Sequence, residues 1–123
     1  IDSRRVQSRD AQKNKSLSLE KIIFADKVSN YLDQLVYVLF EEEYFSYSEN
    51  AQVYVNKIVD FIVSEIASFP HKKTPLALSY LGTYYIFYKS NKRTTWYIFF
   101  KKKATAILIT GISNNHCEEA KEL

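Results

Sequence analysis

The spacing of hydrophobic and polar positions in the first half of the chain is typical first of a strand and then of helices. Residues 19–25, LEKIIFA, form a short aliphatic and aromatic run that suits a β-strand. Residues 26–44 then carry apolar side chains at helical spacing, with Asp26 as the candidate N-cap. Helical spacing returns from Ser48 to the break imposed by Pro70. The pattern therefore predicts one strand followed by two helices.

Each predicted helix has a single apolar stripe, so the pair is expected to form a hairpin joined by FSYS, residues 45–48. Such a hairpin needs a sheet to cover its apolar faces. The first stripe consists of Val28, Tyr31, Leu32, Leu35, Val36 and Leu39, and the second of Ala51, Val55, Ile58, Ile62, Ile66 and Phe69, widened by Val59 and Val63.

The sheet is predicted from three stretches rich in Tyr, Phe, Ile and Thr, at residues 83–90, 94–103 and 104–113. Short separators between them favour an antiparallel meander. In the middle stretch, Thr95, Tyr97 and Phe99 alternate with Trp96, Ile98 and Phe100. Both faces are largely apolar, so we expect a central strand that is buried on the helix side and partly covered on the other. The lysines at 101–103 are assigned to the turn that follows.

These elements predict an α+β fold in one domain: an N-terminal strand, a helical hairpin and a three-stranded antiparallel meander over residues 19–123. Residues 1–18 have too few apolar side chains to fold alone, and they are expected to form a flexible basic tail. Because the chain begins with Ile1 rather than Met, part of that tail would come from processing or from an expression vector.

The formal charge of +3 is small, but its distribution along the chain is uneven. Residues 20–70 contain nine acids and three bases, whereas residues 71–117 contain eight bases and no acid. This asymmetry favours a surface that binds a polyanion. The single cysteine, Cys117, has no partner for a disulfide or a zinc cluster. No apolar stretch approaches the roughly 20 residues of a membrane span, so the expectation is a cytoplasmic protein that makes no membrane contact. The sequence contains no Gly-rich phosphate loop and no metal-ligand cluster, so no metal or cofactor is expected.

Two stretches carry a family resemblance: YYIFYKSNKRTTWYIFF at 84–100, and ILITGISNNH at 107–116. With the element order, they resemble the RelE/ParE superfamily of type II toxins, the plasmid-stabilisation toxins, over residues 19–123. The resemblance implies a cytoplasmic bacterial toxin with a cognate antitoxin as partner. It also implies one of two activities, either metal-free cleavage of mRNA on the ribosome or non-catalytic inhibition of DNA gyrase.

Metal-free cleavage needs a group that moves a proton and groups that stabilise the phosphorane charge. The resemblance favours His116 as the proton-transfer residue, although an exposed tail histidine is an equal alternative, and His71 is better explained as a loop residue. Arg93 is the candidate for charge stabilisation. The candidate substrate-binding residues, each also compatible with an ordinary surface base, are Lys72, Lys73, Lys89 and Lys92.

One departure weakens the nuclease interpretation. Arg93 is the only arginine after residue 9, and it precedes the third predicted strand, whereas the family's nucleases carry an arginine within the third or fourth strand. Charge stabilisation would then rest on Arg93 or on lysines, or catalysis is absent. Tyr97 and Trp96 could stack on bases, although a central strand more often buries them. The alternatives to a ribonuclease toxin are a gyrase-binding toxin and a basic nucleic-acid-binding module without toxicity.

Overall fold

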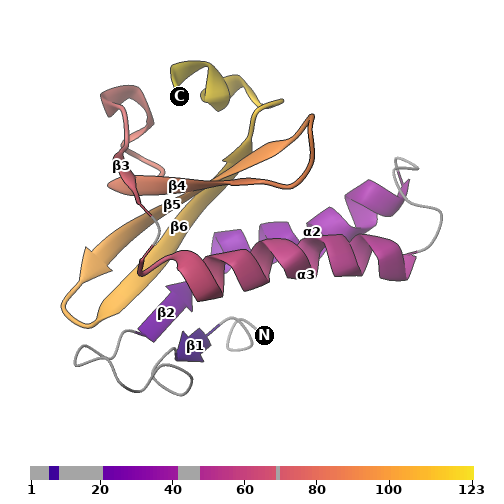
Figure 1. Cartoon of the computed structure of the whole chain (residues 1–123), viewed down its shortest axis with the longest axis horizontal. Coiled ribbons are helices and arrows are strands. Elements are labelled where there is room, and N and C mark those ends of the chain that lie inside the picture. The colour runs from indigo at the N-terminus through magenta and orange to yellow at the C-terminus, as the bar shows by residue number, and fades with distance from the viewer. Residues whose placement is uncertain (1–5, 9–20, 42–47, 69) are drawn as a thin grey trace.

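The computed structural model describes residues 6–8, 21–41, 48–68 and 70–123 (Figure 1). Within these residues the fold is α+β, as predicted, with helices α2 (Asp26–Glu41) and α3 (Ser48–Glu65) and a six-stranded sheet. Two short 3-10 turns, η2 (Leu76–Leu78) and η3 (Glu118–Glu122), complete it. The strands are β1 (Val6–Ser8), β2 (Lys21–Phe24), β3 (Lys72–Lys73), β4 (Tyr84–Lys89), β5 (Thr95–Lys103) and β6 (Ala106–Asn114).

The sheet is larger than the predicted meander. Strands β4, β5 and β6 pair antiparallel in sequence order, as expected, within the strand order β1-β2-β6-β5-β4-β3. The predicted N-terminal strand, β2, lies parallel to β6. Strands β1 and β3 add the two edges, and β1 lies inside the segment predicted to be a flexible tail. The rest of that segment, residues 1–5 and 9–18, lies outside the described residues.

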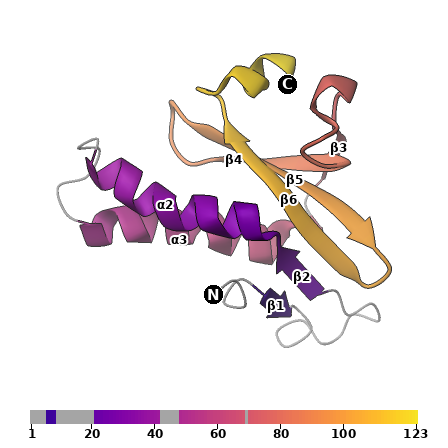
Figure 2. The same cartoon turned by 180° about the vertical axis from the view of Figure 1, so that it is seen from behind.

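Helices α2 and α3 cover one face of the sheet, and their apolar stripes form the main core with it (Figures 1 and 2). Burying this much aliphatic surface is the main favourable term for the fold. Val36, Leu39, Val59 and Val63 pack at its margin. Its buried members are Ile22, Phe24, Val28, Leu32, Leu35, Val55, Ile58, Ile62, Ile66, Ile86, Trp96, Ile98, Phe100, Ile107 and Ile109.

The opposite side of the sheet, called here the helix-free face, is covered only in part. Its buried cluster consists of Leu78, Tyr85 and Phe99, with Leu81, Tyr97 and Leu123 packed against it. Turn η2 contributes Leu78 to this cluster, and Leu123, which follows η3, packs against it. Strand β5 is therefore central, buried on the helix side and partly covered on the other, as the alternation of its side chains predicted.

A bulge in β6 lets the segment before β4 lie directly on the helix-free face. Phe99 pairs with Gly111, but Phe100 pairs with Ile109, so one residue of β6, Thr110, has no partner on β5. The Thr110 hydroxyl donates a hydrogen bond of 2.6 Å to the Leu81 carbonyl. A Cβ atom at Gly111 would lie 2.9 Å from the same carbonyl oxygen, so only glycine allows this close approach.

Two local predictions are wrong. Lys101, Lys102 and Lys103 belong to β5 rather than to a turn, and the turn is made by residues 104–105, with Ala104 at a φ of 46°. Charged side chains are compatible with a strand whose outer edge is exposed. Ala25, not Asp26, caps α2, because its carbonyl accepts the Ser29 N–H at 2.9 Å. Residues 45–47 of the predicted FSYS connection and Phe69 of the second predicted stripe lie outside the described residues, and Ser48 opens α3.

Candidate nucleic-acid interface

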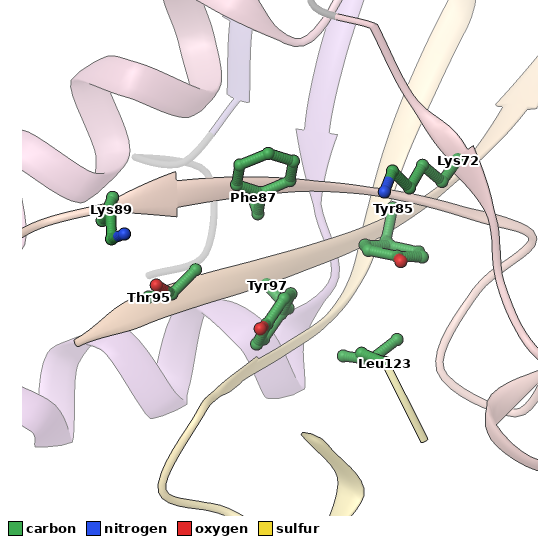
Figure 3. Close-up of a pocket in the computed structure, with 7 residues that line it drawn as sticks. All are labelled: Lys72, Tyr85, Phe87, Lys89, Thr95, Tyr97 and Leu123. Carbon is green, nitrogen blue, oxygen red and sulfur yellow. The ribbon is translucent and has the colours of Figure 1, made fainter. Parts of the chain in front are cut away.

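A hollow of about 250 Å³ lies on the helix-free face, over β4 and β5. Its lining follows from strand register, because directly paired residues share a face. Phe87 pairs with Tyr97, and Lys89 pairs with Thr95. Lys72 of β3 pairs with Tyr85, which brings it to the same face. The complete lining is Lys72, Tyr85, Phe87, Lys89, Thr95, Tyr97 and Leu123 (Figure 3).

Aromatic rings form the floor of this hollow. Tyr85 is buried and makes a T-shaped contact with Tyr97, with ring centroids 6.1 Å apart, and a tilted contact with Phe99 at 5.7 Å. Phe87 keeps 40% of its surface exposed, and Tyr97 is half-buried. The packed rings fix the floor, while the exposed parts of Phe87 and Tyr97 offer surface on which a planar base can stack.

Two lysines lie at opposite ends of the hollow with Phe87 between them (Figure 3). Tyr85, the partner of Lys72, and Lys89 are four residues apart on β4, which corresponds to about 13 Å along the strand. Stacked nucleotides advance by about 3.4 Å each, so this span matches roughly four of them. Within the described residues neither Lys72 nor Lys89 forms an ion pair, so both ammonium groups are available to phosphate oxygens.

The other two predicted substrate-binding lysines lie elsewhere. Lys73 pairs with Tyr84 and thus belongs to the face that meets the helices, beside His71. The His71 ring contacts those of Tyr84 and Phe100 at 4.9 and 5.6 Å, which agrees with a loop residue that packs rather than reacts. Lys92 is exposed in the turn between β4 and β5. Two of the four lysines therefore share the hollow.

Arg93 lies in the same turn as Lys92, and asparagine side chains hold the turn. The Asn91 side-chain oxygen Oδ1 accepts the backbone N–H of Arg93 at 2.8 Å and that of Thr94 at 2.9 Å. The Asn115 amide donates to the Arg93 carbonyl at 2.9 Å and accepts the Thr95 N–H at 2.9 Å. The turn is thereby fastened to the end of β6, which places Arg93 next to the segment that carries His116.

His116 is exposed, and its Nε2 lies 3.3 Å from the Thr94 hydroxyl. It lines a second hollow, of about 510 Å³, on the helix side of the sheet end. Thr95 lines the first hollow and its neighbour Thr94 lines the second. The two hollows therefore meet at the start of β5 and open on opposite faces of the sheet. The lining of the second hollow is Tyr31, Leu35, Val38, Leu39, Tyr54, Asn91, Thr94, Trp96, Asn114 and His116.

The two aromatic residues considered for base stacking have different environments. Trp96 is 2% exposed and donates its indole N–H to the Tyr54 hydroxyl at 2.9 Å, so it is a core residue. Tyr97 faces the lysine-flanked hollow. In the second hollow, burial is the main cause that raises the pKa of Tyr31 from 10.0 to about 12. Its phenol is therefore harder to deprotonate than that of an ordinary tyrosine.

Sequence reasoning did not identify Tyr85, Phe87 or Leu123 as part of a site. The first two could have been found, because in YYIFYK the alternation places Tyr85, Phe87 and Lys89 on one face. Leu123 is 26 residues or more from every other residue of the lining, and nothing in the local pattern of the chain brings it there.

Comparison with protein-family models, with curated proteins and with solved structures finds no match for this chain. Within the described residues, no helix is both long and apolar enough to cross a membrane. The same part of the chain contains no group of three or more His, Cys, Asp or Glu side chains suited to hold a metal ion.

Proposed function

We propose that the protein binds single-stranded RNA in the lysine-flanked hollow and acts as a RelE/ParE-type toxin, a metal-free endoribonuclease of the cytoplasm that cleaves mRNA on the ribosome. The observation that carries the proposal is the combination of exposed aromatic rings with Lys72 and Lys89 at the two ends of the hollow. Aromatic stacking is tolerant of base identity, and lysines neutralise the phosphates. A cognate antitoxin is the protein partner that this function requires.

The corner beside Lys89 is the proposed place of cleavage. Lys89 pairs with Thr95, and the turn between them carries Lys92 and Arg93. A strand that leaves the hollow past Lys89 reaches this turn. There the 2′-hydroxyl gives its proton to solvent, its oxygen attacks the adjacent phosphorus, the bond from phosphorus to the 5′-oxygen breaks, and a 2′,3′-cyclic phosphate forms. Arg93 stabilises the added negative charge, and His116 serves as the proton-transfer group, protonating the departing 5′-oxygen.

The test is inducible expression in a bacterial host, followed by mapping of mRNA 5′ ends. We expect new ends within translated codons, and we expect Tyr97→Leu, His116→Ala and Arg93→Ala each to reduce them. Tyr37→Leu is the matched control for Tyr97→Leu, because Tyr37 is an exposed aromatic residue on α2. Full cleavage by all three site variants would refute the site, and the absence of new 5′ ends would refute the nuclease activity.

A second candidate, a ParE-type gyrase inhibitor without catalysis, is favoured by one observation. His116 lines the hollow on the helix side rather than the hollow that holds Lys72 and Lys89. In that case induction would stop growth with messages intact and with DNA-damage signalling. If induction causes no growth arrest, the hollow with Lys72 and Lys89 is better explained as part of a basic nucleic-acid-binding module without toxicity.

A further inference from the structure

The three lysines at the end of β5 have no part in the proposed interface. Lys101, Lys102 and Lys103 are all exposed, and they pair with Leu108, Ile107 and Ala106 of β6. Strand β2 extends the same end of the sheet, where Lys21 pairs with Ala106 from the other side. Lys21 on β2 and Lys103 on β5 therefore lie on either side of Ala106 of the intervening strand β6.

Strand register separates these lysines into two faces. Ile107 is buried in the core under the helices, so its partner Lys102 belongs to the helix side. Lys101 and Lys103 alternate with it and belong to the helix-free face. Lys21 belongs to the same face, because it pairs with Ala106, which also pairs with Lys103. Lys21, Lys101 and Lys103, called here the lysine cluster, thus share a face with the RNA-binding hollow.

Nothing described nearby neutralises the lysine cluster. None of its members forms an ion pair within the described residues. The acidic turn η3 follows the other end of β6, and Figure 2 shows the β5–β6 turn projecting away from it. Strand β4 begins opposite Phe100, so no described strand pairs with the outer edge of Lys101–Lys103. The positive charge and the strand edge both face solvent.

We infer that the lysine cluster is a second phosphate-binding surface that holds the same RNA strand as the hollow, an inference that rests on the proposed function. Lys101 and Lys103 follow Tyr97 by four and six residues on β5, which is about 13 to 20 Å. That distance corresponds to roughly four to six stacked nucleotides. Between the two sites the strand crosses the segment around Gly82, which lies on Phe99 and Phe100. Only oligonucleotides that extend well beyond the hollow can reach both.

The experiment measures affinity against salt concentration for oligouridylates of four and twelve nucleotides, 2′-O-methylated so that they cannot be cleaved. For a single strand, the slope of log affinity against log salt changes by about 0.7 for each phosphate contact. We expect Lys101→Gln/Lys103→Gln to reduce the slope for the 12-mer by about 1.4 and to leave the 4-mer unchanged. Lys102→Gln should have little effect, because that lysine faces the helix side.

The matched control is Lys27→Gln/Lys57→Gln, which removes the same charge from exposed positions on α2 and α3. Equal effects of the two pairs on the 12-mer would overturn the inference, because net charge alone would explain them. If Tyr97→Leu weakens the 4-mer while the Lys101/Lys103 pair changes nothing, the inference fails and the proposed function stands. If the wild type binds neither oligonucleotide, both are refuted.

Lysines at a strand edge also prevent edge-to-edge association, which is the competing explanation. Lys101→Glu/Lys103→Glu separates the two, because it keeps charge at the edge and reverses its sign. We expect this variant to elute from size-exclusion chromatography at the volume of the wild type and to lose more 12-mer affinity than Lys27→Glu/Lys57→Glu. Affinity equal to that of the control would assign the lysines to edge protection and overturn the inference.

Discussion

The hydroxyl of Tyr54 joins α3 to the sheet corner that carries the proposed cleavage residues. It accepts the Trp96 indole N–H at 2.9 Å and lies 2.8 Å from the Ser90 hydroxyl. Ser90 in turn donates to the Thr94 carbonyl at 3.2 Å, at the end of the turn that carries Arg93. Tyr54→Phe removes one oxygen atom and leaves the buried indole N–H of Trp96 without this partner.

A buried donor that loses its partner costs about 1 to 3 kcal/mol, so we expect the free energy of unfolding to fall by about 2 kcal/mol. For a domain of this size, each kcal/mol lowers the melting temperature by roughly 3 to 6 °C. Urea unfolding followed by far-UV circular dichroism measures the change. Tyr37→Phe, at a side chain that is 72% exposed, is the control and should be nearly neutral.

A double-mutant cycle with Trp96→Phe tests the assigned partner. The double variant should lose less than the sum of the single losses, because both substitutions remove the same hydrogen bond. A Tyr54→Phe loss below about 0.5 kcal/mol would refute the reasoning, since surface substitutions produce changes of that size. Strict additivity of the two losses would show that the hydroxyl and the indole do not interact.

The remaining predictions concern close packing and pH. Gly82→Ala should destabilise the protein by about 1 to 3 kcal/mol, because its Cβ would lie 2.8 Å from the Phe100 nitrogen, and Ser79→Ala is a neutral control for urea unfolding. Because the pKa of Tyr31 is raised to about 12 in the folded state, the stability that its protonated form contributes is complete below pH 10 and is lost between about pH 10 and 12. Urea midpoints over this range should fall less steeply for Tyr31→Phe, and equal slopes would contradict the assignment.

Local patterns were sufficient to predict the helices, the three C-terminal strands and the two faces of β5, because alternation and helical spacing are properties of neighbouring residues. The parallel pairing of β2 with β6 was not predictable, since it joins segments more than 80 residues apart. The lysines at 101–103 favour a turn in the sequence, because they separate two apolar stretches. The turn itself is made by Ala104 at positive φ, where no glycine signals it.

The candidate site was predictable only in parts. Lys72 and Lys89 were both proposed as substrate-binding residues, but their common location depends on the short edge strand β3, which nothing in HKKTP indicates. Alternation could place Phe87 and Tyr97 on one face, yet it could not show that they pair. The separation of His116 from the hollow follows from the path of the chain after β6, which depends on the Asn114 and Asn115 hydrogen bonds.

The parallel pairing of β2 with β6 has a consequence for synthesis of the protein on the ribosome. Strand β2 and both helices emerge long before residues 106–109, with which β2 pairs. Until those residues appear, the apolar stripes of α2 and α3 have no complete sheet to pack against, and β2 has no partner on the β6 side. Folding of the domain must therefore await residues 106–109, and the nascent helices are the segment that a chaperone would have to protect.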